Sequence, residues 1–171
     1  VNSWVTIEHE QHLEFGDPNS EFTVAAWVRT MDGGSIVSKG RPGDRLSNID
    51  YVFSVFEDGG LEFLRWNEKS RRAENISWGD PNVPLCDGEW HYVAFVNRAD
   101  DEHSLYVDGE WVKTSKAVWI YNNANTEVVQ IGRYRNAIYS ENIFDGEIDN
   151  LLITKRALSE SEIRAFMHKK N

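Results

Sequence analysis

Two acidic side chains near the C-terminus, Glu147 and Asp149, are separated by a single residue within a β-rich stretch. Side chains two residues apart in a strand point to the same face of the sheet, so we expect these carboxyl groups to lie side by side. Retaining glycoside hydrolysis needs two carboxyl groups about 5 Å apart, one as nucleophile and one as acid and base. Hydrolysis of a glycosidic bond is therefore the first hypothesis, and the other residues of the chain must be consistent with it.

Aromatic residues beside amides and charged residues point to sugars in a second way. The chain has seven Trp, six Tyr and eight Phe, more than a core of this size must use. Sugar C–H faces stack on aromatic rings, and sugar hydroxyls pair with amide, carboxylate and guanidinium groups. The candidates for such a surface are Trp66, Trp78, Trp119, Tyr121, Asn123, Arg133, Tyr134 and Tyr139. Taken singly, each aromatic is better explained as part of a cluster that caps the fold, but as a set they predict a binding surface.

Two of these stretches are the first choices for that surface. Trp119–Asn125 combines aromatic residues with three Asn, and Arg133–Tyr139 places two Tyr beside two Arg and an Asn. Both leave predicted neighbouring strands, so we expect them to converge.

Bulk composition excludes several classes of protein. At 171 residues the chain fits one domain that can bury a substantial core. Its 28 acidic and 18 basic residues give a net charge of −10, which repels a phosphate backbone and suits divalent cations or neutral ligands. The single Cys86 excludes an intrachain disulfide, and His91 is expected to be a packed histidine. No apolar run is long enough to cross a membrane, so neither nucleic acid binding nor membrane insertion is expected.

Short β-rich runs separated by turn residues make up most of the chain. Tyr92–Arg98 alternates with bulky residues on both faces, which predicts a strand that is covered on both sides. Asn67–Glu74 is charged and is expected to be a mobile loop. Leu158–Met167 is the one good helix, because Ser159 and Glu162 form a capping box before an apolar face. About a dozen short strands and one helix predict an all-β, two-sheet antiparallel sandwich.

Seven motifs in fixed order carry a family resemblance. They are FTVAAWV (Phe22–Val28), SIVSKG (Ser35–Gly40), LEFLRW (Leu61–Trp66), GEWHYV (Gly88–Val93), LYVDG (Leu105–Gly109), VVQIGR (Val128–Arg133) and FDGEIDNLLITKRALSESEI (Phe144–Ile163). Together they resemble the laminin-G-like, concanavalin A-like jelly-roll family, in its microbial branch because no disulfide is present. The resemblance implies a jelly roll of two curved sheets with one short C-terminal helix, in which Trp27 and Trp90 pack inside core motifs. It implies one domain over residues 1–171 that is excised from a larger protein, and the chain starts just after the strand with which the family usually begins.

The same resemblance bears on catalysis and on metal binding. Laminarinase-type glycosidases of this fold carry E-x-D-x-x-E on one strand, and here Leu152 stands at the third acidic position. The acid/base is missing, so we expect no enzyme. Relatives often hold a structural Ca²⁺ with an Asp of the last strand, which makes Asp149, the Gly146 carbonyl and either Asn2 or Ser3 the expected calcium ligands. The alternative is that Asp149 only hydrogen-bonds backbone.

The function that these observations predict is a non-catalytic, lectin-like carbohydrate-binding module of an extracellular or cell-surface multidomain protein. Its partner would be a glycan or polysaccharide, with a structural calcium. Two alternatives remain open at this point: an adhesion module for a protein or peptide, and an architectural domain packed on an enzyme.

Overall fold

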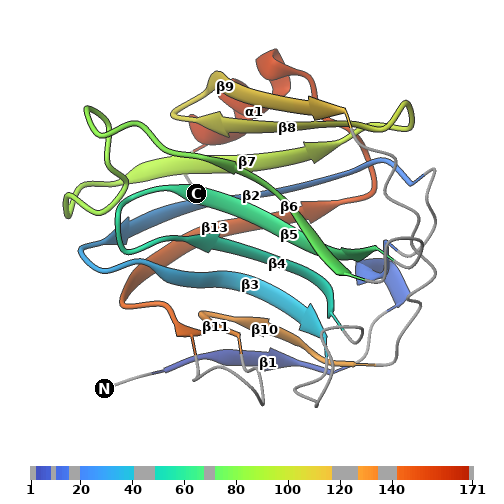
Figure 1. Cartoon of the computed structure of the whole chain (residues 1–171), viewed down its shortest axis with the longest axis horizontal. Coiled ribbons are helices and arrows are strands. Elements are labelled where there is room, and N and C mark those ends of the chain that lie inside the picture. Colours follow the sequence, from blue (N-terminus) through green and yellow to red (C-terminus); the bar gives the residue numbers. More distant parts are fainter. Residues whose placement is uncertain are drawn as a thin grey trace.

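Two antiparallel sheets packed face to face form the molecule (Figure 1). The computed structural model describes residues 3–8, 11–15, 20–40, 49–67, 72–116, 127–134 and 142–169. One sheet has six strands in the order β1 (Val5–Ile7), β10 (Val129–Ile131), β3 (Gly34–Gly40), β4 (Ile49–Val55), β5 (Leu61–Asn67) and β6 (Arg72–Trp78). The other has five in the order β13 (Gly146–Thr154), β2 (Phe22–Thr30), β7 (His91–Asn97), β8 (Glu102–Val107) and β9 (Glu110–Lys116). The predicted antiparallel sandwich is confirmed.

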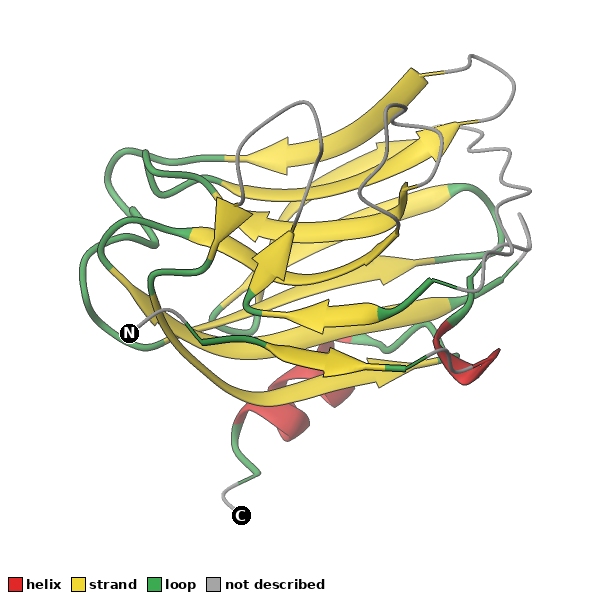
Figure 2. Cartoon of the chain, turned by 90° about the horizontal axis from the view of Figure 1, so that it is seen from below, coloured by secondary structure: helices red, strands yellow, loops and turns green. Residues whose placement is uncertain are grey.

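Four smaller elements complete the described structure. A 3-10 turn, η1 (Gln11–Leu13), precedes β2, and the two-residue strands β11 (Arg133–Tyr134) and β12 (Asn142–Ile143) pair beside β3. Helix α1 (Glu160–Met167) lies on the outer face of the five-stranded sheet (Figure 2). None of the helices in the described residues is long and apolar enough to cross a membrane.

The main core lies between the two sheets and is rich in stacked aromatic rings. Phe63 of the six-stranded sheet stacks on Phe95 of the five-stranded sheet, with ring centroids 3.6 Å apart and planes 2° from parallel. Phe53 and Phe22 tilt against the same pair. Aromatic contacts of this kind contribute about 0.5–1.5 kcal/mol each beyond the area they bury. The alternation of large apolar residues therefore fixes which face of each strand meets the other sheet.

A second cluster covers the opposite face of the five-stranded sheet. Tyr92 and Ala94 of β7 and Tyr106 of β8 pack there against Leu158 and Ile163, which precede and belong to α1. Every residue of β7 is buried, so the prediction of a strand covered on both sides is confirmed. The capping box begins α1 as predicted, and the helix in turn shields a sheet face that would otherwise expose apolar side chains to water.

A histidine between two carboxylates fixes the β7–β8 hairpin. His91 Nδ1 lies 2.8 Å from Asp108 Oδ2, and His91 Nε2 lies 3.2 Å from Asp87 Oδ1. The Tyr92 amide donates to Asp108 Oδ1 at 2.8 Å. Burial alone would lower the pKa of His91, but the hydrogen bonds and charges of Asp108 and Asp87 outweigh burial and raise that pKa. The histidine is thus a structural residue, as its motif indicated.

A buried ion pair closes the end of the core where β2 begins. Arg65 and Asp50 are each 1% exposed, and the Arg65 Nη2 to Asp50 Oδ1 distance is 3.3 Å. Arg65 also donates to the Phe15 carbonyl at 2.6 Å, and its guanidinium lies 5.3 Å from the centre of the Phe22 ring. Burial raises the pKa of the Asp50 carboxyl, and Arg65 opposes that shift. This pair ties β4, β5 and the segment before β2 together.

Candidate functional site

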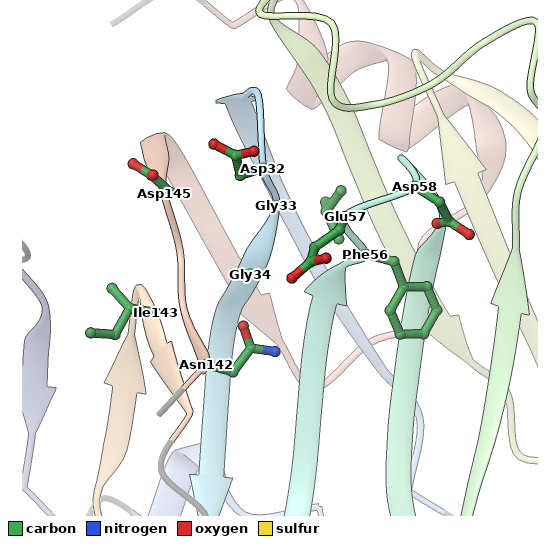
Figure 3. A pocket seen from close by; sticks show the side chains of 10 residues that line it. Asp32, Gly33, Gly34, Phe56, Glu57, Asp58, Asn142, Ile143 and Asp145 are labelled. Atoms are coloured by element: carbon green, nitrogen blue, oxygen red, sulfur yellow. The ribbon is translucent and has the colours of Figure 1, made fainter. Parts of the chain in front are cut away.

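A large hollow lies at the opposite end of the sandwich, where β2 ends (Figure 3). Three connections meet there: the β2–β3 turn, the β4–β5 turn and the link from β12 to β13. The hollow, which we call the end pocket, has a volume of about 870 Å³. Its described lining is Asp32, Gly33, Gly34, Val55, Phe56, Glu57, Asp58, Asn142, Ile143 and Asp145. A volume of this size lies within the range of about 300–1,000 Å³ that is typical of small-ligand sites.

Glycine and threonine let the first and third connections meet. A Cβ on Gly34 would lie 2.3 Å from the Ile143 carbonyl oxygen, so only glycine permits this approach. The buried Thr30 hydroxyl donates to the Asp145 carbonyl at 2.5 Å and accepts from the Gly33 amide at 2.8 Å. The Asp145 amide donates to the Gly33 carbonyl at 2.9 Å. The wall of the end pocket is therefore held rigidly by backbone contacts.

The β4–β5 turn forms the other wall. The Phe56 amide donates to the Gly60 carbonyl at 2.7 Å, and the Gly60 amide donates to Asp58 Oδ1 at 3.0 Å. Cys86 Sγ donates to the Phe56 carbonyl at 3.2 Å. Within the described residues, Glu57 makes neither a hydrogen bond nor an ion pair, and in Figure 3 its carboxylate and the Asn142 amide point into the hollow. Glu57 and Asn142 are thus the two polar side chains best placed to meet a ligand.

The charge of the end pocket defines what it can bind. Four carboxylates line it, those of Asp32, Glu57, Asp58 and Asp145, and the described lining includes neither Lys nor Arg. Carboxylates accept hydrogen bonds from hydroxyl groups, and the Asn142 amide both donates and accepts. Phe56, whose side chain is 39% exposed, adds an apolar surface at the rim. The arrangement suits a neutral or cationic ligand rich in hydroxyl groups and disfavours an anion.

The described residues do not assemble the predicted calcium site. Asp149 is exposed on β13 opposite Trp27, whereas Gly146 lines a separate hollow of about 220 Å³ beside Trp4. Of the two alternatives for the third ligand, Asn2 lies outside the described residues, and Ser3 lines the same hollow as Gly146, without Asp149. Among those that are described, no three His, Cys, Asp or Glu side chains are close enough to share a metal ion. The described part of the chain therefore does not fit calcium by itself, and calcium binding stays a prediction.

Most of the predicted sugar-binding residues cannot be placed. Trp119, Tyr121, Asn123 and Tyr139 lie outside the described residues, as does the side chain of Trp66 at the end of β5. Lys116, which precedes the first of these stretches, ends β9 at the side of the sheet where β2 begins.

The three predicted residues that can be placed have different surroundings. Arg133 is 7% exposed, and its guanidinium stacks 4.0 Å from the centre of the Trp4 ring. Tyr134 pairs in register with Asn142 and so adjoins the end pocket, and burial raises its pKa to about 12. Trp78 is half-buried and packs against the main core. Arg133 pairs in the same way with Ile143, but none of the three residues belongs to the described lining of the end pocket.

The carboxylate pair on β13 is engaged in structural contacts. Glu147 forms an ion pair with Arg29, and Asp149 Oδ1 accepts from the Asn150 amide at 2.8 Å. Leu152 packs in the cluster beneath α1. Glu147 and Asp149 do not line the end pocket.

The acidic residues of the end pocket were not predicted from the sequence, although a repeated triplet could have indicated them. The triplet Asp-Gly-Gly occurs twice, at Asp32–Gly34 and at Asp58–Gly60, and each copy forms a turn between consecutive strands. Antiparallel neighbours place alternate turns at the same end of a sheet. Gly34 at the start of β3 pairs with Val55 at the end of β4, so the two turns lie at the same end of the six-stranded sheet.

Comparison with known proteins identifies the family. A family model described as the concanavalin A-like lectin/glucanases superfamily matches residues 1–164. The chain therefore belongs to this superfamily. No curated protein sequence matches it significantly.

Solved structures with the same fold have low sequence identity. The carbohydrate-binding module CBM40 of the Ruminococcus gnavus IT-sialidase, bound to α2,3-sialyllactose, is 15% identical with a TM-score of 0.70, and the match covers 95% of each chain. The binding domain of botulinum neurotoxin DC in complex with rat synaptotagmin II is 16% identical with a TM-score of 0.64, covering 96% of this chain and 39% of that one. The binding domain of Paraclostridial Mosquitocidal Protein 1 is 14% identical with a TM-score of 0.69, covering 95% and 40%. At such identities these likenesses establish the fold alone.

Proposed function

We propose that this chain is a non-catalytic, lectin-like carbohydrate-binding module of an extracellular or cell-surface protein, and that the end pocket is its ligand site. The observation that carries the proposal is a rigid hollow lined by four carboxylates, one amide and an exposed phenyl ring. Hydroxyl groups of a sugar would donate to Asp32 and Glu57, and the Asn142 amide would pair with a further hydroxyl or an acetamido group. The superfamily and the CBM40 structure bound to sialyllactose support a sugar as the ligand class.

The charge of the pocket narrows the ligand class. The CBM40 relative is bound to a sialylated sugar, which carries a carboxylate. In the end pocket such a group would approach four carboxylates without a cationic partner among the described lining residues. We therefore expect a neutral glycan or an amino sugar to be the ligand of this chain.

A binding role is also favoured over hydrolysis by the residues of β13. Glu147 is occupied by Arg29, and the position of a second catalytic carboxylate holds the apolar Leu152. A sugar bond cannot be protonated by a leucine, so the pair lacks its acid. The protein-binding alternative rests only on the receptor complex of a neurotoxin domain with the same fold.

Site-directed variants test the proposal directly. Glu57→Gln and Asn142→Ala should each weaken binding of a glycan selected on a glycan array by about three- to tenfold, the loss expected for one or two hydrogen bonds. Asp100→Asn is the matched control, because Asp100 is an exposed acidic turn residue at the opposite end of the sandwich. Titration calorimetry would measure the affinities. Equal binding by all three variants would place the sugar elsewhere and refute the end pocket.

Calcium is a separate proposal with its own test. If Asp149 and Asn2 share an ion, millimolar Ca²⁺ should raise the unfolding midpoint relative to EDTA by mass action. An Asp149→Asn variant should lose that shift. An unfolding midpoint that is the same in Ca²⁺ and in EDTA would refute the proposed calcium site.

A further inference from the structure

A second hollow lies on the outer face of the five-stranded sheet, beside the C-terminal end of α1. We call it the tryptophan pocket. It has a volume of about 370 Å³, and its described lining is Trp27, Trp90, Asp149, Asn150, Met167, His168 and Lys169, so one carboxylate and one ammonium group balance each other in number. It shares none of its described lining residues with the end pocket.

Its two indole rings differ from the packing residues that the sequence predicted. Trp27 is only half-buried, and its ring tilts against Tyr92 with centroids 5.4 Å apart. Trp90 is 37% exposed, which leaves much of its ring open to solvent. Within the described residues, neither indole N–H makes a hydrogen bond. The prediction that both tryptophans pack inside the core is therefore wrong for Trp90 and only partly right for Trp27.

A neighbouring ion pair holds the exposed indole in place. The Arg29 guanidinium lies 5.1 Å from the centre of the Trp90 ring, and Arg29 is itself paired with Glu147. Cation–π contacts at such exposed sites contribute about 0.5–1 kcal/mol, enough to bias the ring toward one orientation. The open part of the Trp90 ring is thus presented as a preorganised apolar platform.

A β-bulge supplies the polar side of the same hollow. The pairing of β13 with β2 shifts register between Asp149 and Leu152, and Asn150 within the shift has a φ of 49°. This left-handed conformation is unfavourable for a residue with a Cβ, and bulges of this kind often re-aim side chains beside functional sites. The Asn150 amide donates to Asp149 Oδ1, which fixes the carboxylate at the edge of the tryptophan pocket.

We propose that the tryptophan pocket is a second saccharide-binding site, which takes one neutral pyranose unit of a polysaccharide. The C–H face of the ring would stack on Trp90, and adjacent hydroxyls would donate to the free lone pairs of the Asp149 carboxylate. The Trp27 indole N–H and the His168 imidazole are further hydrogen-bonding groups at the wall of the hollow. An apolar platform with a carboxylate at its edge matches the two surfaces of a pyranose.

The size of the hollow favours a sugar unit over a protein partner. A stable protein interface buries about 800 Å² on each partner, which requires a broad patch. Here the apolar surface is confined to a concavity of about 370 Å³ with a polar edge.

Because the two hollows lie on different faces, one module could contact two segments of a polymer. The second contact would raise the overall affinity for the polymer through avidity.

Indole NMR signals would report binding at this site. The protein would be labelled with ¹⁵N at its indole nitrogens and titrated at millimolar concentration with cellohexaose, maltohexaose and chitohexaose in separate experiments. We expect at least one of these probes to shift the Trp27 and Trp90 signals. Failure of all three probes to move either signal would overturn the proposal.

Variants separate this site from the end pocket and from effects on folding. Trp90→Ala should weaken binding of the active probe by about tenfold. Asn150→Gly keeps the left-handed conformation and the backbone amide that holds Asp149, but it removes the Asn150 side chain from the lining of the hollow. It should therefore weaken binding about threefold without loss of fold. Trp111→Ala is the matched control, since Trp111 is 56% exposed on β9 and does not line the hollow.

The remaining outcomes decide between the two sites. Glu57→Gln should leave the indole shifts unchanged, because Glu57 lines only the end pocket. Indole shifts that persist undiminished in Trp90→Ala, or that disappear in Glu57→Gln, would show that the sugar binds elsewhere. Either result would refute the tryptophan pocket while leaving the end pocket to its own test.

Discussion

The acidic end pocket should discriminate against sialylated sugars, and the size of that effect follows from its geometry. A sphere with the volume of the pocket, about 870 Å³, has a radius of about 6 Å. Two unit charges about 6 Å apart in water interact by about 0.7 kcal/mol, and physiological salt reduces this by about half. Four carboxylates would therefore oppose a bound sialate by about 1.3 kcal/mol, a factor of about nine in affinity.

Lactose and α2,3-sialyllactose provide a matched pair of probes, because they differ by one charged sugar. We expect calorimetry to give about tenfold weaker binding for sialyllactose in physiological salt, and a smaller difference at high salt. The double variant Asp32→Asn/Glu57→Gln removes half of the lining charge, so it should improve sialyllactose binding about threefold relative to lactose. Asp100→Asn serves as the charge control. Tighter binding of sialyllactose than of lactose, unchanged in the double variant, would refute this electrostatic reasoning.

Three further predictions concern stability. The pKa of His91 is raised in the folded state, so the stability that this histidine contributes is complete below about pH 6.5 and is lost as the pH rises through its folded pKa. His91→Gln should therefore lower the free energy of unfolding by about 1 kcal/mol more at pH 5.5 than at pH 8.5, as measured by denaturation in urea. An equal cost at both pH values would contradict this linkage. Arg65→Met should lower the free energy of unfolding by about 3–5 kcal/mol, because it leaves the buried Asp50 carboxylate unpaired. Adding Asp50→Leu to the same chain should restore most of the lost stability, as measured by the midpoint in denaturant. No recovery in the double variant would show that the unpaired Asp50 carboxylate does not cause the loss. Ser159→Ala should cost about 1 kcal/mol by removing the cap of α1, and an unchanged thermal midpoint would count against the cap.

Turn chemistry and alternation predicted the fold well because they act locally. The sequence Tyr92–Arg98 has large side chains at both odd and even positions, which predicted that both faces of β7 are covered, since a strand covered on both sides has no polar face. The capping box of α1 was recognisable for the same reason, because Ser159 and Glu162 are three residues apart. Strand β6 was missed: Asn67–Glu74 was expected to be a mobile loop, yet β6 begins at Arg72. It is an edge strand, whose charged residues can remain in water while its backbone pairs with β5.

The binding surfaces were harder to predict because they join distant segments. Thr30 and Asp145, whose hydrogen bond shapes the end pocket, are separated by 115 residues. Aromatic residues are the strongest sequence signal for sugars, but the same residues build cores, and Trp78 proved to be a core contact. Trp90 shows the converse error, since a family core motif presents this ring to solvent. Burial of an aromatic side chain depends on which distant segments pack over it, and a single sequence does not reveal those contacts.

The most direct test of the central claim is a glycan array that carries neutral, amino and sialylated glycans, probed with the wild-type protein and with Asn142→Ala. The account predicts binding to neutral or amino sugars, weaker signals for their sialylated counterparts, and loss of signal in the variant. Absence of binding to every glycan, or binding confined to sialylated glycans and unaffected by Asn142→Ala, would contradict it.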